Sequence, residues 1–351
     1  MKGKVLVTGG TGYIGSHTVI DLLDNGFEVL SIDNYLNSSP DSLKNIATIT
    51  GKNIQNYAVD LVDLAATRSV FEESPDLVGI IHFAALKSVG ESVEKPWDYF
   101  NNNLNGLLNI LKCAEEFNVP NFIFSSSCSV YGNTDDLPVT ESTPIKEAES
   151  PYARTKQIGE YIIQDYCKAR PEFNAILLRY FNPAGAHESA KIGEAPTSNA
   201  TNLVPVITAT AIGKRDKITV FGTDYDTRDG SCIRDYIHIM DLANAHTKSL
   251  EYLIAKRNEQ NCETFNVGLG AGATVLEAIN AFEKVTGQQL NYELGARRAG
   301  DVVAIYADND RASQRLQWQP TRNIEDIMRT AWEWEKVRWK ENAEDRILNT
   351  K

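Results

Sequence analysis

The sequence lacks the features that mark membrane, secreted and nucleic-acid-binding proteins. It has no run of about 18 apolar residues, which is the length that a membrane-spanning helix needs. Met1-Lys2-Gly3 leads straight into an apolar segment, so we expect no signal peptide. Positive charge is in the minority, with 35 lysines and arginines against 47 aspartates and glutamates, and the formal net charge is −12. We therefore expect no membrane and no nucleic acid as the main partner, and an anionic ligand would need arginines or helix N-termini placed locally.

Cysteine and histidine are scarce, with five residues of each, and neither shows metal-ligand spacing. An odd number of cysteines without such spacing is typical of a reduced, cytoplasmic protein. Cys128 stands among serines, and we expect it to be a packed neighbour rather than a nucleophile. The sequence thus predicts no metal site, and it contains no internal repeat or low-complexity segment.

The first half of the sequence alternates short apolar segments with helical patterns. We predict strands at 4–8, 28–32, 53–59, 79–83, 121–125 and 175–180, and helices at 16–25, 64–72, 96–118 and 151–169. Such alternation indicates an α/β fold of the Rossmann type, a doubly wound parallel sheet covered on both faces by helices. Ligands bind these sheets beyond the carboxyl ends of the strands.

After residue 185 the sequence becomes rich in glycine, proline, serine and asparagine, and the expected elements become shorter. We therefore predict two domains, a cofactor-binding Rossmann domain at 1–181 and a smaller α/β substrate-binding lobe at 182–351. Strands near 236–239 and 264–267 could return to the large sheet, and the second lobe would then not be continuous in sequence. The segment 324–340 has apolar residues at helical spacing and is expected to pack in a core.

Seven residues, Gly9-Gly10-Thr11-Gly12-Tyr13-Ile14-Gly15, connect the first predicted strand to the first predicted helix. In that context glycines allow a tight turn and let the backbone approach a pyrophosphate, whose charge faces the helix N-terminus. Asp33 ends the second strand about twenty residues later, where a carboxylate binds adenosine ribose hydroxyls and repels a 2′-phosphate. Together these signals favour NAD over NADP. The alternatives are a plain strand–helix turn and an aspartate that caps a turn.

Ser150-Pro151 is a helix start, because the hydroxyl caps a free N–H group and proline fits the first turn. Tyr152 and Lys156 follow four residues apart, so both side chains leave the same helix face. An ammonium beside a phenol can lower the phenol's pKa, and about three units require roughly 4 kcal/mol, which a cation at about 4 Å supplies. The pair therefore predicts a tyrosine acid/base. The alternative is an ordinary surface pair.

The chain resembles the extended short-chain dehydrogenase/reductases that epimerise UDP-glucose and UDP-galactose at C4, in the segments TGGTGYIGSH, HFAALKSVGESVEKP, FIFSSSCSVYG, SPYARTK, LLRYFNPAGAH and IRDYIHIMDLA. The resemblance runs from residue 4 to about residue 334 without a large gap. It implies an NAD-dependent isomerase whose partners are UDP-glucose and UDP-galactose. It also implies a homodimer in which the helices at 96–118 and 151–169 form a four-helix bundle with their mates.

The resemblance further implies a role for individual residues. Tyr152 would be the catalytic base, Lys156 its partner and a ribose ligand, and Ser127 a hydroxyl that hydrogen-bonds the sugar oxygen. The NAD-binding residues would be Gly9, Gly12, Tyr13, Ile14, Asp33, Asn34, Asn37, Ser38, Asp60, Leu61, Phe83, Ala84, Ala85, Lys87, Asn102, Tyr152, Lys156, Tyr180 and Phe181. The substrate-binding residues would be Lys87, Ser127, Tyr152, Asn182, Asn202, Leu203, Phe221, Arg234, Arg298, Asp301 and Ile305.

Related proteins with other activities carry different residues at these positions. Nucleotide-sugar 4,6-dehydratases carry an Asp-Glu pair where this chain has Cys128 and Ser129. Decarboxylating relatives need further carboxylate-handling residues that we do not find, and non-catalytic NAD-sensing proteins of this fold lose the tyrosine or the lysine. Ile305 stands where the family has a tyrosine that fills the sugar pocket or a small cysteine that leaves room. Activity on UDP-N-acetylglucosamine, alone or with dual specificity, therefore remains open.

Overall fold

The computed structural model describes residues 2–196, 200–297 and 302–348, with side chains up to residue 340. The chain forms two compact units, and neither is continuous in sequence. Unit 1 comprises Met1–Tyr180, Leu242–Val267 and Asp308–Gln319, and unit 2 comprises Phe181–Asp241, Gly268–Ala307 and Pro320–Lys351. In the part of the chain that the structure describes, no helix combines the length and the apolar character needed to cross a membrane.

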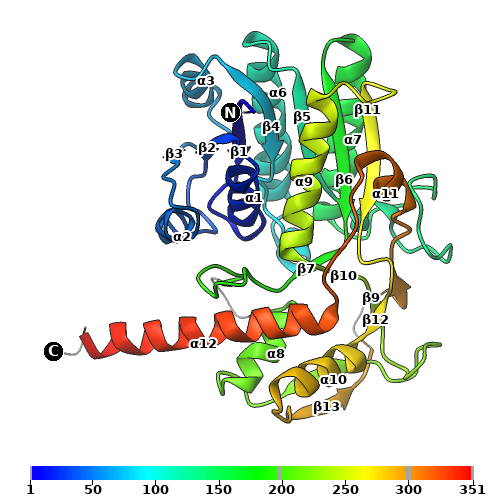
Figure 1. The fold of residues 1–351 in the computed structure, drawn as a ribbon. Helices are drawn as coiled ribbons and strands as arrows, with labels where there is room; N and C mark the ends of the chain where they lie inside the picture. The colour runs from blue at the N-terminus through cyan, green and yellow to red at the C-terminus, as the bar shows by residue number, and fades with distance from the viewer. Residues whose placement is uncertain (1, 197–199, 298–301, 349–351) are drawn as a thin grey trace. The chain divides into compact units, whose positions relative to one another are not determined.

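Unit 1 is built on a seven-stranded sheet in the order β11-β6-β5-β4-β1-β2-β3, with every neighbouring pair parallel (Figure 1). The strands are β1 (Lys4–Thr8), β2 (Glu28–Ile32), β3 (Gln55–Tyr57), β4 (Leu77–His82), β5 (Asn121–Ser127), β6 (Asn174–Tyr180) and β11 (Cys262–Val267). The chain builds outward from β1 to β3 and then outward from β4 in the opposite direction. The predicted Rossmann-type fold is confirmed, and the crevice between β1 and β4 is the topological switch point where ligands bind.

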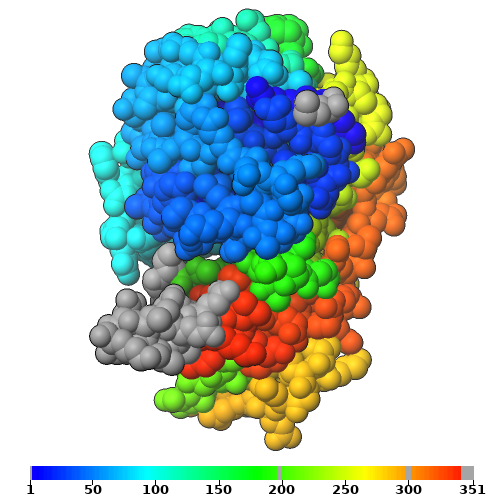
Figure 2. Space-filling model, turned by 60° about the vertical axis from the view of Figure 1, so that its left-hand side comes forward, coloured from blue at the N-terminus to red at the C-terminus, as the bar shows by residue number. Residues whose placement is uncertain are grey.

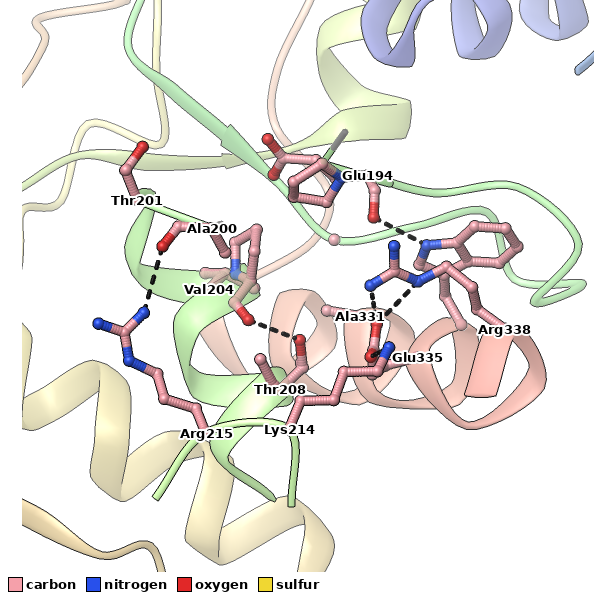
Figure 3. Close-up of a pocket in the computed structure, with 15 residues that line it drawn as sticks. Glu194, Ala200, Thr201, Val204, Thr208, Lys214, Arg215, Ala331, Glu335 and Arg338 are labelled. Atoms are coloured by element: carbon pink, nitrogen blue, oxygen red, sulfur yellow. Dashed lines mark hydrogen bonds and ion pairs between the residues drawn. The ribbon is translucent and has the colours of Figure 1, made fainter. Parts of the chain in front are cut away.

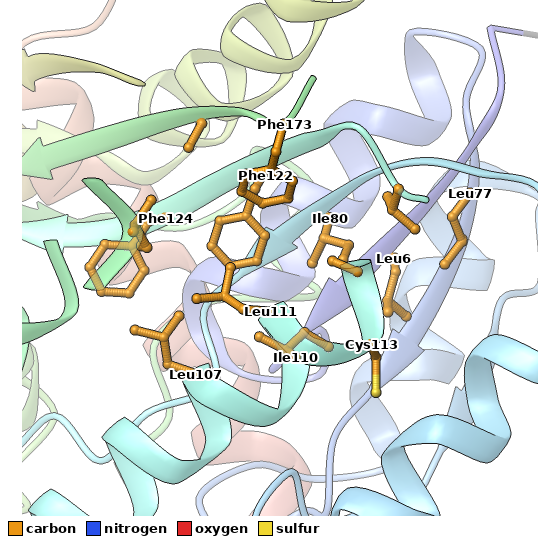
Figure 4. Packing of buried hydrophobic residues seen from close by; sticks show 14 of the residues in the cluster. Leu6, Leu77, Ile80, Leu107, Ile110, Leu111, Cys113, Phe122, Phe124 and Phe173 are labelled. Carbon is orange, nitrogen blue, oxygen red and sulfur yellow. The ribbon is translucent and has the colours of Figure 1, made fainter. Parts of the chain in front are cut away.

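Helices cover both faces of this sheet. Figure 1 shows α1 (Tyr13–Asp24) and α9 (Ile239–Ile254) on one face and α6 (Gly106–Glu116) and α7 (Pro151–Ala169) on the other. On the second face Leu6, Ile80 and Phe122 of the strands pack against Leu107, Ile110 and Leu111 of α6 (Figure 4). Because both faces are buried, the strands read as continuous apolar segments, as the sequence indicated. In the space-filling view the segments around α2 and α3, in blue, form one continuous face of unit 1 (Figure 2).

Several boundaries differ from the predicted ones. The helices α2 (Asp41–Thr50) and α4 (Val89–Glu94) were not predicted; each buries a single residue, so neither has a clear apolar stripe. The long helix expected at 96–118 is α5 (Pro96–Phe100), a π-helical turn (Asn101–Asn105) and α6. The helices α3 (Leu64–Glu72) and α7 have the bounds expected from their caps and apolar spacing.

The described residues of unit 2 form three small sheets and a helical core. The sheets have the orders β10-β7, β12-β9-β14 and β13-β8. Their strands are β7 (Asn182–Ala184), β8 (Ile218–Phe221), β9 (Ile233–Arg234), β10 (Tyr236–His238), β12 (Ala273–Thr274), β13 (Tyr292–Gly295) and β14 (Ala304–Ile305). The helices α8 (Leu203–Ala211), α10 (Val275–Thr286) and α12 (Ile324–Leu348) supply most of the apolar core, together with Ile218 and Val220 of β8.

The two strands that were expected to return to the large sheet behave differently. β11 pairs with β6 in the large sheet over six residues. β10, near 236–239, pairs in parallel with β7 instead, so that expectation was wrong for this strand. The reason is local: Asn182 donates two hydrogen bonds to the carbonyl oxygen of Asp235, from its backbone N–H at 3.0 Å and from its side chain at 3.2 Å.

Candidate active site

The glycine loop lies at the carboxyl end of β1 and leads into α1. Gly9 has a φ of +71°, and a Cβ atom there would lie 3.0 Å from the backbone nitrogen of Ala84. A Cβ atom on Gly15 would lie 2.1 Å from the carbonyl oxygen of Gly9, so the first turn of α1 touches the loop directly. Gly12 is the N-cap residue, and no side chain caps the helix. A helix N-terminus without a side-chain cap is the kind of site that binds an anion.

Asp33 directly follows β2 and organises the neighbouring loop. One carboxylate oxygen accepts hydrogen bonds from the Tyr35 backbone N–H and the Ser38 hydroxyl, both at 2.9 Å. The other oxygen accepts from the backbone N–H of Thr11 at 3.1 Å, which ties this loop to the glycine loop. Asn34 accepts from the Leu36 backbone N–H, and the predicted contact Asn37 lies in the same loop. Three of the roughly four lone-pair sites of the carboxylate are therefore in use, and the oxygen that binds Thr11 keeps one acceptor site for a ribose hydroxyl.

The other predicted cofactor contacts of unit 1 follow β3 and β4. Asp60 accepts a hydrogen bond from the Val62 backbone N–H at 3.0 Å, and Leu61 is buried. Phe83, which follows β4, places its ring centroid 4.6 Å from that of His246, and Ala84 donates to the Thr8 hydroxyl. The ammonium of Lys87 lies 6.0 Å from the centroid of the Tyr13 ring. Ala85 lies in the same loop, and Asn102 lies in the π-helical turn.

The predicted catalytic residues meet at the carboxyl end of β5. The strand extends two residues beyond its expected end, so Ser127 is its last residue. The Lys156 ammonium donates to the Ser125 carbonyl oxygen at 2.7 Å, and lies 5.9 Å from the Tyr152 ring centroid. A side-chain hydrogen bond joins Ser127 to Tyr152, and the hydroxyls of Ser125 and Tyr180 are also hydrogen-bonded. The structure therefore brings these five side chains into one site.

The protonation of the Tyr152–Lys156 pair differs from the sequence expectation. Burial raises the pKa of Tyr152 above its usual value, and the hydrogen bond from Ser127 offsets only part of this effect. The ammonium of Lys156 is bound to the Ser125 carbonyl oxygen and not to the Tyr152 hydroxyl. Burial also lowers the pKa of Lys156 to about 8. The role of Tyr152 as an acid/base therefore stays a prediction, and a further positive charge nearby would favour its deprotonated form.

The remaining predicted substrate contacts, and the predicted cofactor contact Phe181, belong to unit 2. Asn182 and Arg234 flank Asp235, and Ile305 of β14 is the register partner of Arg234. Phe181 is buried, Asn202 is the N-cap residue of α8, Leu203 is the first residue of that helix, and Phe221 ends β8. Arg298 and Asp301 lie outside the described residues.

Two buried residues that organise these segments were not predicted. Asn103, one residue after Asn102, binds the backbone of Leu86 and the hydroxyl of Thr155. In unit 2 the carboxylate of Asp235 accepts hydrogen bonds from the backbone N–H groups of Leu269, Gly270 and Ala307 at 2.7, 3.1 and 3.0 Å. Three consecutive asparagines, Asn101-Asn102-Asn103, are unusual inside a helix, but only the fold shows which of the three faces inward.

Unit 2 also contains a cavity of about 560 Å³ between α8 and α12 (Figure 3). None of the predicted site residues lines it, although Ala200, Thr201 and Val204 stand beside Asn202 and Leu203 in the chain. Its most buried charge, Glu335, is neutralised by Lys214 at 2.6 Å and Arg338 at 2.8 Å. The cavity is therefore not the candidate active site.

Comparison with known proteins agrees with this geometry. Residues 6–331 match the family model described as GDP-mannose 4,6 dehydratase. The UDP-glucose 4-epimerase of Schizosaccharomyces pombe is 45% identical over 95% of this chain and 94% of its own. The Bifidobacterium longum UDP-glucose 4-epimerase, solved in complex with NAD⁺ and UDP, is 43% identical with a TM-score of 0.90, over 95% of this chain and 98% of its own. The UDP-Glc/GlcNAc 4-epimerase of Campylobacter jejuni is 38% identical with a TM-score of 0.82, over 95% of this chain and 99% of its own.

The family model and the relatives point to different reactions on one fold, and the local sequence distinguishes them. Cys128 and Ser129 begin a short 3₁₀ turn (Cys128–Tyr131) directly after β5, and this turn contains no carboxylate. The tyrosine and lysine of the site are both present and lie together. With relatives at this identity over nearly the whole chain, the chain belongs to the UDP-glucose 4-epimerases of the extended short-chain dehydrogenase/reductase family.

Proposed function

We propose that this protein interconverts UDP-glucose and UDP-galactose by inverting C4 of the hexose, with NAD bound throughout the cycle. The observation that carries this proposal is the meeting of Tyr152, Lys156 and Ser127 at the carboxyl end of β5, one strand away from the switch-point strand β4. Family membership supports the same reaction, since the relatives named above are UDP-glucose 4-epimerases.

The residues of unit 1 fit NAD. The uncapped N-terminus of α1 and the glycines that precede it suit a pyrophosphate, because a side chain at Gly9 or Gly15 would collide with backbone. Asp33 suits a ribose hydroxyl of adenosine and would repel a 2′-phosphate, which favours NAD over NADP. Two loops would enclose the cofactor, the one after β2 with Asn34, Asn37 and Ser38 and the one after β4 with Phe83, Ala84, Ala85 and Lys87.

In the proposed mechanism Tyr152 exchanges a proton with the 4-hydroxyl of the sugar. Ser127 hydrogen-bonds the same oxygen and holds it against the phenol, and Lys156 binds ribose and adds positive charge behind Tyr152. NAD, when bound, would supply the hydride chemistry at C4, and its positive nicotinamide would add charge that favours deprotonated Tyr152. Tyr152 would return the proton to the same sugar oxygen after the 4-keto sugar has rotated in the site.

Unit 2 is proposed to hold the UDP part of the substrate. Arg234 and Arg298 would bind the diphosphate, because a guanidinium matches phosphate geometry and supplies local charge in an acidic protein. Asn182, Asn202, Leu203, Phe221 and Asp301 would contact the nucleotide. Tight binding of UDP leaves the hexose free to turn, which this reaction requires.

A second substrate class is supported by one residue. Ile305 is buried beside Arg234 and is smaller than tyrosine, so it would leave more room for an acetamido group than tyrosine would. The Campylobacter jejuni relative is described as acting on both UDP-Glc and UDP-GlcNAc. We propose UDP-N-acetylglucosamine as a secondary substrate, to be compared directly with UDP-galactose.

We also propose a homodimer in the cytoplasm. Val89 and Val93 of α4, Trp97 of α5, Leu108 of α6 and Tyr161 of α7 are exposed, and Trp97 is 71% accessible. Trp97, Leu108 and Tyr161 belong to the helices that pair in the family's dimer, and Val89 and Val93 belong to the preceding helix, so a second copy of the chain is the proposed occupant. All five cysteines are free thiols, which supports a reducing compartment.

The decisive test is a coupled assay in which the purified protein receives no added NAD. UDP-galactose is supplied, and the protein is then removed by filtration. Only after that step are UDP-glucose dehydrogenase and NAD added, and the NADH that forms measures the UDP-glucose. We expect turnover with the resident cofactor alone. Absence of turnover, even after preincubation with NAD, would contradict the proposed reaction.

A further inference from the structure

A buried ion pair lies directly behind the catalytic segment, and the mechanism above does not use it. Arg179 of β6 contacts both carboxylate oxygens of Glu160 on α7, at 2.9 and 2.6 Å. The side chains are only 4% and 2% exposed. An ion pair removed from water in this way is expensive to maintain unless it has further partners and a role.

The pair has such partners, and they lie next to the site. The hydroxyl of Ser126 donates to Glu160 at 2.5 Å, and Arg179 donates to the Tyr131 hydroxyl at 3.1 Å. Tyr131 in turn donates to Asn266 of β11 at 2.6 Å. The network therefore joins α7 to β5, β6 and β11 and to the 3₁₀ turn that follows the catalytic serines.

Three consecutive serines of β5 thus bind three different groups. Ser125 binds Lys156 through its carbonyl oxygen, Ser126 binds Glu160, and Ser127 binds Tyr152. Glu160 lies one helical turn beyond Lys156, as Lys156 lies one turn beyond Tyr152, so all three side chains leave the same face of α7. Glu160 therefore places a carboxylate one helical turn beyond Lys156, on the face of α7 that meets β5.

We propose that Glu160 is a positioning residue of the catalytic pair, held in place by Arg179 and Ser126. It fixes the end of β5 that binds Lys156 and Tyr152, and it supplies the negative charge that keeps Lys156 an ammonium. This inference rests on the proposed function, because it assumes that Lys156 must be protonated for the reaction.

The groups around Lys156 support the proposal that Glu160 keeps Lys156 protonated. Its own helix contributes Tyr152 and Glu160, and β5 contributes the Ser125 carbonyl and the Phe124 ring, whose centroid lies 5.0 Å from the ammonium. From β4 comes His82, whose pKa is lowered to about 3 by burial, so that it is neutral near pH 7. Burial lowers the pKa of Lys156 to about 8, and the charge of Glu160 opposes that shift.

The test measures the titration of Lys156 directly. The protein is labelled with ¹³C at the lysine ε-carbons, and the Lys156 signal is assigned by its loss in Lys156→Met. We expect a midpoint near 8 in the unchanged protein and a midpoint lower by about one pH unit in Glu160→Gln. The alkaline limb of the kcat profile with UDP-galactose should move by the same amount.

Two further variants separate positioning from simple stability. Glu160→Gln leaves Arg179 buried without its partner, so the double variant E160Q/R179Q should recover thermal stability while the Lys156 midpoint stays low. Glu116→Gln is the matched control, because it breaks the exposed ion pair with Arg68 at 2.7 Å in the same unit. It should leave the midpoint unchanged.

A Lys156 midpoint equal to that of the unchanged protein in both Glu160 variants would overturn the inference, even if those variants melted at lower temperature. The NMR measurement needs no substrate, so it remains decisive if the protein does not epimerise UDP-galactose. In that case the proposed function is wrong, and the titration midpoint of Lys156 alone decides whether Glu160 keeps Lys156 protonated.

Discussion

The side-chain amide of Asn103 donates a hydrogen bond to the hydroxyl of Thr155 at 3.1 Å, directly before Lys156 in α7. The same amide group binds both backbone groups of Leu86, accepting from its N–H at 2.8 Å and donating to its carbonyl oxygen at 3.0 Å. One buried residue thus links the loop after β4 to the helix that carries the proposed catalytic pair, Tyr152 and Lys156. It lies in a π-helical turn, a rare conformation that is frequent at functional sites.

Replacing Asn103 by leucine should therefore weaken both the loop and the site. The Leu86 N–H and carbonyl groups would lose their partners, and each buried unsatisfied group costs about 1–3 kcal/mol. We expect a lower melting temperature, less NAD retained per protomer on purification, and a lower kcat. Asn105→Leu is the control, because Asn105 is exposed in the same turn and its amide binds only Asn101. Equal NAD retention in the two variants would contradict the assigned role of Asn103.

Tyr152→Phe should reduce kcat by about 10³-fold, because a positioned general acid/base contributes about 10²–10⁴-fold and phenylalanine preserves the ring. Binding of UDP and NAD should change little, since no contact other than the hydroxyl is removed. The coupled UDP-galactose assay gives the rate, and equilibrium binding of UDP gives the control value. Tyr161→Phe, on the exposed side of the same helix, should keep full activity. A Tyr152→Phe variant with more than a tenth of the normal kcat would exclude Tyr152 as the base.

Gly15→Ala should release the cofactor, although alanine is normally the better helix residue by about 1 kcal/mol. The added Cβ atom would lie 2.1 Å from the Gly9 carbonyl oxygen and 2.9 Å from Gly10 Cα, so the glycine loop must move. We expect NAD, measured by absorbance after denaturation, to fall below a tenth of its usual content per protomer. Gly90→Ala, at the start of α4, meets nothing within 4 Å and should retain NAD fully. Full retention in Gly15→Ala would show that the pyrophosphate does not use this loop.

Trp97→Glu should dissociate the proposed homodimer, because it places a charge in the centre of the exposed apolar set on α4 to α7. Sedimentation or light scattering should show a dimer for the unchanged protein and a monomer for the variant at micromolar concentration. Leu294→Glu is a matched control, since Leu294 is also well exposed, at 61%, but belongs to β13 in unit 2. A monomeric unchanged protein would contradict the proposed assembly and leave the exposed residues without an assigned partner.

The sequence predicted those features that depend on local chemistry. The bounds of α7 follow from Ser150, whose hydroxyl accepts from the Ala153 N–H, and from Pro151 in the first turn. The glycine loop and Asp33 were recognised because their roles depend on backbone conformation at the end of a strand. The end of β5 was placed two residues early, because three serines do not resemble a buried strand although all three are buried.

Features that depend on tertiary contacts were not predicted. Glu160 and Arg179 are nineteen residues apart, and only the packing of α7 on β6 brings them together. The raised pKa of Tyr152 could not be foreseen either, because helical spacing places Lys156 on the right face without revealing that Ser125 binds its ammonium. In the sequence nothing distinguishes Asp235 among the 47 acidic residues. Only the fold shows that three backbone N–H groups donate to its carboxylate.

Asp235 should make stability depend on pH in a direction opposite to that of most carboxylates. Burial raises its pKa from 3.8 to about 6, and the three backbone hydrogen bonds offset only part of that shift. The raised value means that the folded state binds the proton more tightly than the unfolded state. The stabilisation is therefore fully present below about pH 4 and is lost as the pH rises through about 6, by about 3 kcal/mol in all.

The contribution of Asp235 is isolated by comparison with Asp235→Asn, which cannot titrate. Urea unfolding of both proteins at pH 4.5 and pH 7 gives the difference in unfolding free energy at each pH, and groups common to both proteins cancel. That comparison removes His246, whose pKa is lowered to about 4 by burial and whose effect on stability runs the other way. We expect the unchanged protein to lose stability relative to the variant between the two pH values. A difference that is constant with pH would show that the carboxylate titrates near its usual value, and that its three hydrogen bonds fully compensate for burial.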